Sequence, residues 1–242
     1  MTPTIILIIS LAALAAAFTQ RVSGFGFGIF MMTLLPHLMP SYGEATALSG
    51  ILAILTALIP AIRKRRYVPI QKLWLILLTF VIVSFFAVIG VTKIDSRSLK
   101  HVLGAILILV SIYFLFFSGK IHFKPNKATQ LSMGTLSGIM GGLFAMQGPP
   151  AVIYCIGCTD DKDEYIALTQ WYFLIGNMMM TIFRGSNGLV TVDVLKACAF
   201  AMIGVVLGVV IGSHVFDKIN GNTLKKIVYG YMAVAGLITM LS

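Results

Sequence analysis

The sequence predicts an all-α polytopic membrane protein, with about eight transmembrane helices in two homologous four-helix repeats that contain Gly/Pro-broken or re-entrant segments. Of its 242 residues, 58% are hydrophobic and only 11% are charged, whereas a soluble domain carries about 25% charged residues. Two apolar segments are too long for one span, and the two halves of the chain share residues in the same order. These observations exclude a water-soluble globule.

The apolar segments are separated by short polar loops, so the chain has no room for a folded soluble domain. A single span needs about 20 residues. No Lys or Arg precedes the first apolar run, so we interpret this run as a span and not as a cleaved signal. The segments fall at 4–36, 44–62, 68–91, 98–117, 129–157, 164–183, 191–214 and 223–241.

The first and fifth segments are overlong. As one helix, 4–36 would measure about 50 Å, against a hydrocarbon core of about 30 Å. Glycine interrupts both segments, so we expect each to break or re-enter. The interrupting residues are Ser23-Gly24-Phe25-Gly26-Phe27-Gly28 in the first segment, and Gly138, Gly141, Gly142, Gly148, Pro149 and Pro150 in the fifth.

The two halves look like copies, with repeats at 1–120 and 129–242 joined by a basic linker at 121–128. An even number of crossings per repeat would make the copies parallel, and an odd number would invert them; both remain open. The matches are Ser23-Gly24, Gly28 and Pro36 with Ser137-Gly138, Gly142 and Pro150 at an offset of 114, Glu44 with Glu164 at 120, and Lys93-Ile94 with Lys218-Ile219 at 125.

The net charge of +10 sits in short loops, where cations set membrane orientation, and we expect no nucleic-acid partner. A count of eight spans with the N-terminus inside places Arg63-Lys64-Arg65-Arg66, Lys72, Lys120, Lys124, Lys127 and Arg184 in the cytoplasm. Lys93, Arg97, Lys100, Lys162, Lys218, Lys225 and Lys226 then lie on the other side. A true re-entrant hairpin would reverse the side of the later loops.

Non-helical backbone at membrane depth is tolerated only inside protein or along a wet cavity. Each break is followed by a new apolar run, whose unpaired N–H groups and positive dipole end favour an anion. We expect one half-helix to begin near Pro149, because proline suits a first helical turn. The alternative is that the glycines only allow close helix packing, which is our interpretation of Gly204, Gly208 and Gly212.

Neutral polar residues inside the spans add candidate donors. Gln170 and Asn177 are seven residues apart and so share a helix face. Gln20 and Arg21 directly precede the first break. Arg21 is either a counter-charge for an anion or a side chain that snorkels to the interface.

Cys155 and Cys158 have the spacing of a thiol-redox motif but lack its soluble βαβ context. The histidines share no ligand spacing, and the acids form no convincing catalytic pair. We therefore expect no catalytic residues, no metal and no cofactor. An intramembrane thiol-redox enzyme remains an alternative.

The motifs resemble those of the sulfite exporter TauE/SafE-like membrane proteins over nearly the whole chain. Ser23 to Gly28 with Pro36 is similar to the family's first Gly-rich motif, and Gly141-Gly142 through Gly148 to Tyr154 is similar to its second. Phe173 to Phe183, with Asn177, Arg184 and Gly188, is similar to its later pattern. Gln147 stands where that second motif often has another glycine.

This resemblance implies a transporter of the bacterial inner membrane for sulfite, thiosulfate or organosulfonates, generally in the direction of export. Its expected partners are a small anion and the lipid bilayer, while coupled protons and a homodimer stay open. An anion channel is the main alternative. The predicted substrate-binding residues are Gln20, Arg21, Gly24, Phe25, Gly26, Phe27, Gly28, Gln147, Gly148, Pro149, Pro150, Gln170 and Asn177.

Overall fold

The computed structural model describes residues 2–116, 126–215, 230, 231 and 233–240, and the secondary structure within these ranges is helical. The first half contains five α-helices and a short 3₁₀ turn, and the second contains four α-helices and a further helical stretch at 230, 231 and 233–240. The α-helices are α1 Pro3–Ser23, α2 Phe27–Leu38, α3 Tyr42–Arg63, α4 Ile70–Lys93, α5 Ser96–Phe116, α6 Lys127–Phe144, α7 Gly148–Cys158, α8 Lys162–Ser186 and α9 Val192–Val215, and the 3₁₀ turn is Arg65–Tyr67.

Six of these helices are long and apolar enough to cross a membrane: α1, α3, α4, α5, α8 and α9. The multi-pass prediction is therefore confirmed, although eight spans are not. The predicted segment 223–241 lies only partly within the described residues, as do the linker 121–128 and its cations. Large apolar side chains on the outside of α4, α5 and α9 are exposed and suit contact with lipid, for example Phe86, Leu109 and Ile203.

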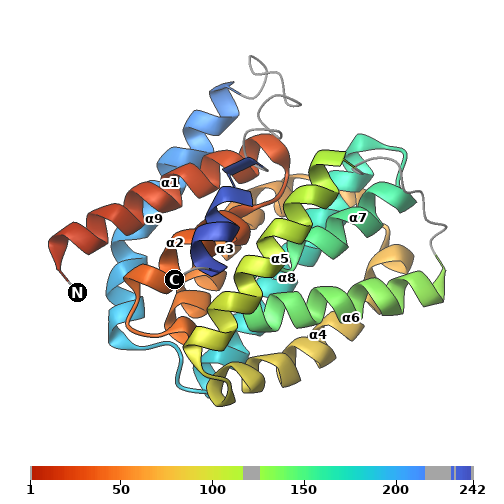
Figure 1. The fold of residues 1–242 in the computed structure, drawn as a ribbon. Coiled ribbons are helices and arrows are strands. Elements are labelled where there is room, and N and C mark those ends of the chain that lie inside the picture. Colours follow the sequence, from red (N-terminus) through yellow and green to blue (C-terminus); the bar gives the residue numbers. More distant parts are fainter. Residues whose placement is uncertain (1, 117–125, 216–229, 232, 241–242) are drawn as a thin grey trace.

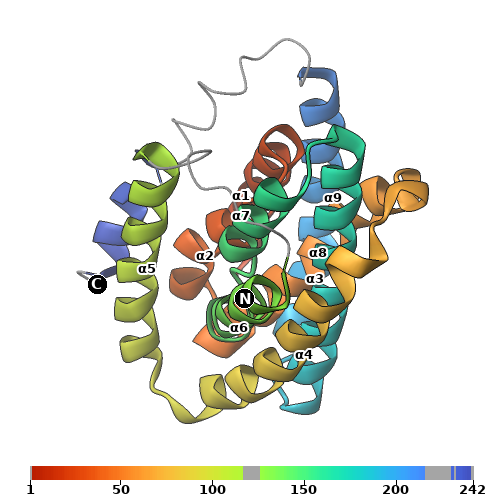
Figure 2. The ribbon, with the colours of Figure 1, turned by 90° about the vertical axis from the view of Figure 1, so that its right-hand side faces the viewer.

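Both overlong segments break, as predicted. The first forms α1 and the 12-residue α2, and the fifth forms α6 and the 11-residue α7. At 1.5 Å per residue, α2 and α7 span only about 16–18 Å, roughly half of the hydrocarbon core. Figure 2 shows these two short helices near the middle of the molecule, between α5 on one side and α3, α8 and α9 on the other.

The second break is shorter than predicted, because α6 continues through Gly138, Gly141 and Gly142 and ends only at Phe144. These glycines do not interrupt a helix. Gly138 and Gly142 bring α6 against the backbone of α4 at Phe80 and Ser84. The match of Ser137-Gly138 to Ser23-Gly24 at an offset of 114 is therefore wrong, since the first pair lies within a helix and the second at a helix end.

Small residues set the two closest helix pairs, α1 with α9 and α4 with α6 (Figure 1). Gly204 and Gly208 abut the backbone of Ser10 and Leu14, so a methyl group at either glycine would overlap a carbonyl oxygen of α1. The packing interpretation of Gly204, Gly208 and Gly212 is thus confirmed. In both pairs the residue numbers rise together along the contact, so the paired helices run parallel.

The helices α3 and α8 also pack together, but they run in opposite directions. Gly43 lies against Leu189 at one end of the contact, and Gly50 lies against Arg184 nearer the middle. At the other end, Lys64 forms an ion pair with Asp163 at 2.6 Å. We call this second end, which carries Arg63, Lys64, Arg65, Arg66 and Lys72, the basic end.

The placement of Lys162 on the side opposite the basic run is wrong, because Lys162 begins α8 at the basic end. The neighbouring acids confirm this position through the Lys64–Asp163 and Lys72–Glu164 ion pairs, each 2.6 Å. The physical reason is the break itself. Each overlong segment crosses the bundle and then turns back through a short helix, so each supplies two directions of travel where one had been counted.

Arg184 was also expected in a cytoplasmic loop, and this too is wrong. Its side chain is fully buried within α8. Arg184 lies two turns beyond Asn177, on the same face of the helix. The interior of the bundle therefore holds a cation that loop counting assigned to the aqueous phase.

Membrane-impermeant maleimide labelling tests this arrangement in a background with Cys155, Cys158 and Cys198 changed to Ser. Arg66→Cys and Lys162→Cys, both exposed at the basic end, should react from the same side of the membrane. Lys93→Cys, exposed at the end of α4, should react from the other side and serves as the reference. Labelling of Lys162→Cys together with Lys93→Cys would contradict the reversal of the chain at the breaks.

Candidate functional site

The first break depends on two glycines with left-handed backbone. Gly24 caps the C-terminus of α1 with φ 87°, and Gly26 caps the N-terminus of α2 with φ 107°. L side chains rarely adopt these angles, so glycine is required here for the turn. The Ser23 hydroxyl bonds to the carbonyl oxygens of Thr19 and Phe25, at 2.7 and 2.6 Å, and so joins both sides of the break.

The second break achieves a similar turn at Ala145, whose φ of 54° is left-handed although it is not a glycine. The amides of Ala145 and Met146 donate back to the carbonyls of Gly141 and Met140, at 3.0 and 3.2 Å. These two bonds satisfy the last turn of α6. Helix α7 then begins at Gly148, close to the predicted start near Pro149.

A chain of hydrogen bonds from other helices holds the second break in place. The Tyr172 hydroxyl donates to Ser137 Oγ at 2.7 Å, and Ser137 Oγ donates to the carbonyl oxygen of Gln147 at 2.6 Å. Tyr172 and Ser137 are both buried. The backbone of the break is therefore fixed by side chains of α8 and α6.

The two breaks touch each other. Gly28, in the first turn of α2, lies so close to the Ala145 carbonyl oxygen that a methyl group at Gly28 would overlap it. Both short helices therefore begin at this contact and lead away to opposite ends, because α2 continues into the start of α3 and α7 continues to the basic end. Two positive helix ends converge on one buried region.

A small buried cavity, which we call the central cavity, lies between the breaks. Its volume is about 30 Å³, the space of one water molecule in the liquid. Ala53 and Asn177, which lie near the middle of α3 and α8, place it at mid-depth in the bundle. Its lining residues are Gln20, Gly26, Phe27, Gly28, Ile29, Ala53, Ala145, Met146, Gln147, Gly148, Phe173 and Asn177.

The N-terminus of α2 offers more backbone donors to this cavity than that of α7. The Phe27 amide donates to Gln20 Oε1 at 3.0 Å, while the amides of Gly28 and Ile29 belong to the first turn and have no intrahelical acceptor. In α7, Pro149 and Pro150 have no N–H group. The expected contribution of α7 is thus reduced to its dipole and to the Gly148 amide.

Neutral side chains complete the polar lining. Gln147 Nε2 donates to the Phe173 carbonyl at 3.5 Å, and its buried Oε1 has no hydrogen-bond partner within the described ranges. Gln20 Nε2 donates to Thr56 Oγ1 at 2.7 Å. Asn177 is buried on the cavity wall, and none of the described residues forms a hydrogen bond with its side chain.

A larger cavity leads from Gln20 toward the basic end. It has a volume of about 250 Å³, and its lining includes Gln20, Arg21, Thr56, Lys162 and Gln170. It shares Arg21 and Lys162 with an outer cavity of about 540 Å³ that also includes Arg63, Lys64 and His214. We call these two cavities together the basic vestibule. Cations along this route attract anions toward the central cavity.

The predicted site residues separate into three groups. Seven line the central cavity: Gln20, Gly26, Phe27, Gly28, Gln147, Gly148 and Asn177. Arg21, Gly24 and Gln170 lie in the vestibule, where Arg21 Nε donates to Ser213 Oγ at 2.7 Å and Gln170 Nε2 donates to the Gly24 carbonyl at 3.1 Å. Phe25, Pro149 and Pro150 are buried behind the lining, with Phe25 packed on Phe114.

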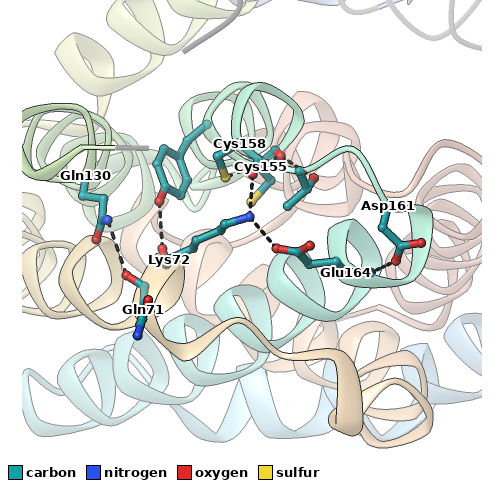
Figure 3. Close-up of polar contacts among 9 residues, drawn as sticks. Gln71, Lys72, Gln130, Cys155, Cys158, Asp161 and Glu164 are labelled. Atoms are coloured by element: carbon teal, nitrogen blue, oxygen red, sulfur yellow. Dashed lines mark hydrogen bonds and ion pairs between the residues drawn. The ribbon is translucent and has the colours of Figure 1, made fainter. Parts of the chain in front are cut away.

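Cys155 and Cys158 lie apart from this site, near the basic end of α7. Figure 3 shows them beside Lys72, whose Nζ donates to the Cys158 carbonyl at 2.8 Å and to Glu164 Oε1 at 2.6 Å. All three cysteines are buried and free. The polar contacts of this cluster join the start of α4 to α7 and α8.

Within the described part of the chain, no group of three or more His, Cys, Asp or Glu side chains could hold a metal ion. The arrangement can instead stabilise negative charge, since it combines two helix N-termini, neutral amide donors and a cationic approach. Its chemistry is that of binding and passage of an anion.

The family model for the sulfite exporter TauE/SafE matches residues 9–239 of the chain. The chain belongs to the TauE/SafE family of sulfite exporters. This TauE/SafE protein is therefore a multi-pass membrane protein of a transporter family. Comparisons with curated proteins and with solved structures each find no match.

Sequence reasoning missed the importance of Arg184 to this TauE/SafE protein, although the signal was present. Gln170, Asn177 and Arg184 follow one another at seven-residue intervals and so lie on one face of a single helix. Counting Arg184 as a loop cation hid that pattern. Ser49 and Thr56 on the facing side of α3 carried no comparable signal, because single hydroxyl residues are common in spans.

Gly28→Ala should lower the thermal unfolding midpoint of the protein in detergent, because the new methyl group overlaps the Ala145 carbonyl and forces the breaks apart. Overpacking of this kind destabilises by about 1–3 kcal/mol. Gly148→Ala is the matched control, since its methyl group would lie 3.8 Å from Phe173 and Phe25. Equal midpoints for the two variants would contradict the close contact of the breaks.

Proposed function

We propose that this TauE/SafE protein is a secondary transporter that exports small sulfur-containing anions, such as sulfite, thiosulfate or organosulfonates, across a bacterial inner membrane. The observation that carries the proposal is the convergence of the α2 and α7 N-termini on the central cavity. Half-helix ends at mid-depth, beside amide donors, favour an anionic group without requiring a metal. The family supplies the sulfur chemistry.

The anion would enter the central cavity from the basic vestibule. Arg21 lies in the vestibule and would attract the anion there, while Gln20 lines both spaces and would pass it inward. Gln147 and Asn177 would then donate to its oxygens. The central cavity has about 30 Å³, so binding would require the two breaks to separate slightly.

Alternating access would follow from two inverted repeats, which we infer from helix positions and directions. The starts of α2 and α7, of α3 and α8, and of α4 and α9 are 121, 120 and 122 residues apart. Exchanging the halves converts the parallel pair α1 with α9 into the parallel pair α6 with α4, and α3 runs against its counterpart α8. The four apolar segments of a repeat supply five helices, and this odd number supports inversion.

The repeats would take the boundaries 1–120 and 129–242, with α6 beginning just before the second at Lys127. Rocking of one repeat against the other would close the basic vestibule and open the other side of the cavity. By the positive-inside rule, the basic end would face the cytoplasm, which suits loading for export. Proton coupling and a homodimer remain predictions.

Counterflow in proteoliposomes tests the proposal. Vesicles preloaded with unlabelled sulfite should accumulate radiolabelled sulfite transiently, with saturable kinetics, and thiosulfate and sulfoacetate should compete better than sulfate. Each measurement is repeated with and without a pH gradient. Flux without saturation or counterflow would favour an anion channel, and no flux of any anion under any gradient would contradict transport.

The same assay separates transport from thiol-redox chemistry. A Cys155→Ser/Cys158→Ser double variant should retain wild-type counterflow, because neither thiol lines the central cavity or the basic vestibule. Loss of counterflow in a variant that folds normally would support the redox alternative.

Gln147→Leu should weaken sulfite binding about three- to tenfold, the usual effect of one lost hydrogen bond, because it removes a donor from the cavity wall at nearly constant volume. Isothermal titration calorimetry of the purified protein measures the change. Gln130→Leu is the matched control, since Gln130 is similarly buried but lies outside the central cavity. Equal dissociation constants for the two variants would remove Gln147 from the site.

A further inference from the structure

Arg184 carries a positive charge into the centre of the bundle. Its side chain is fully buried, and Nη2 donates to the carbonyl oxygens of Gly141 and Gly142, at 2.8 and 3.3 Å. These carbonyls belong to the last turn of α6, where the helix dipole is negative. Arg184 therefore caps the helix that leads into the second break.

This capping uses only part of the guanidinium. Within the described part of the chain, Nε and Nη1 have no hydrogen-bond acceptor. The Lys64–Asp163 and Lys72–Glu164 ion pairs lie at the basic end and involve other cations. A helix C-terminus supplies only about half a negative charge, so a buried arginine with no carboxylate partner keeps a substantial uncompensated charge.

Three hydroxyl groups near Arg184 are also unpaired. Tyr42 and Ser49 come from α3 and Thr181 comes from α8, and the oxygen of each is buried without a partner among the described residues. Both Arg184 Nη1 and Thr181 Oγ1 lie beside Gly50, at 2.8 and 3.8 Å from the position that a Cβ would take. We call Arg184, Tyr42, Ser49 and Thr181 the Arg184 cluster.

The Arg184 cluster borders the central cavity on the side away from the basic vestibule. Arg184 follows cavity-lining Asn177 by seven residues, and Ser49 precedes cavity-lining Ala53 by four. These steps are whole turns along one face of each helix, about 6–10 Å toward the opposite end. Ser49 Oγ also lies 3.8 Å from the position of a Cβ on Gly28, at the contact between the breaks.

We propose that the Arg184 cluster is a second anion station, which receives the sulfur oxyanion from the central cavity as the protein opens away from the basic end. This inference rests on the proposed transport function and adds a counter-charge to it. The N–H groups of Nε and Nη1 and the three hydroxyls would bond the oxygens of the anion. Charge-assisted hydrogen bonds of this kind are about twice as strong as neutral ones.

A purely structural role, in which Arg184 only caps α6, makes a different prediction. Capping needs Nη2 alone and explains neither the remaining unpaired nitrogens nor the unpaired hydroxyls around Gly50. A structural arginine should affect the stability of the anion-free protein, whereas a binding arginine should also affect the stabilisation that an added anion produces.

The test combines calorimetric titration of sulfite with thermal unfolding, both with and without sulfite, for the full-length protein in detergent. Arg184→Gln removes the charge and should raise the dissociation constant for sulfite at least about tenfold. Arg184→Lys keeps the charge but has fewer donors, and should show a smaller rise. Both should lose sulfite-dependent stabilisation in that order.

Ser49→Ala and Thr181→Val keep the test valid if the arginine variants fail to fold, because these hydroxyls support no other described group. Each should weaken sulfite binding about threefold or more. Thr92→Val is the matched control, since Thr92 is an exposed threonine on α4 whose hydroxyl bonds only to the Ile89 carbonyl.

Wild-type affinity in folded Arg184→Gln, or in both hydroxyl variants where Arg184→Gln does not fold, would overturn the second station. The proposed function would still stand, provided that the wild-type protein binds sulfite. If the wild-type protein shows neither sulfite binding nor counterflow, the proposed function fails, and this inference fails with it.

Discussion

The structure depends on satisfying broken backbone in the middle of a membrane bundle. Each break removes helical hydrogen bonds where water is scarce, and an unpaired peptide group there costs several kcal/mol. Side chains distant in sequence provide the missing partners: Gln20 to Phe27, Gln170 to Gly24, Ser137 to Gln147, and Arg184 to Gly141. The residues that hold the breaks are therefore also those nearest to the proposed anion path.

Close helix packing makes this arrangement rigid on the outside. The glycines of α6 and α9 bring these helices onto the backbones of α4 and α1, where dispersion contacts stabilise association within lipid. The central region is less tightly specified, because α2 and α7 are short and meet mainly through Gly28 and Ala145. A fixed outer frame around a small central contact is compatible with movement at the breaks, since the outer pairs can move as units.

Much of the fold was predictable from the sequence, because hydrophobic length and glycine interruption are strong local signals. The lengths of 4–36 and 129–157 predicted both breaks, and Pro149 predicted the start of α7. The direction of the chain after each break was not predictable from composition, and so Lys162 was assigned to the wrong end. The burial of Arg184 was missed for the same reason, since a basic residue near the end of an apolar run resembles a loop cation.

The two inner arginines illustrate why a membrane protein can use charge in two different ways. Arg21 lies in the basic vestibule, where water and nearby charges screen it and where its attraction for an anion is long-range and weak. Arg184 is fully buried, so its field is less screened, and an anion that reaches it also relieves the cost of its burial. Tight binding there would slow release, however, and the half charge of the α6 C-terminus reduces that tightness. The carbonyls of Gly141 and Gly142 would thus keep Arg184 attractive enough to receive an anion but weak enough to let it leave.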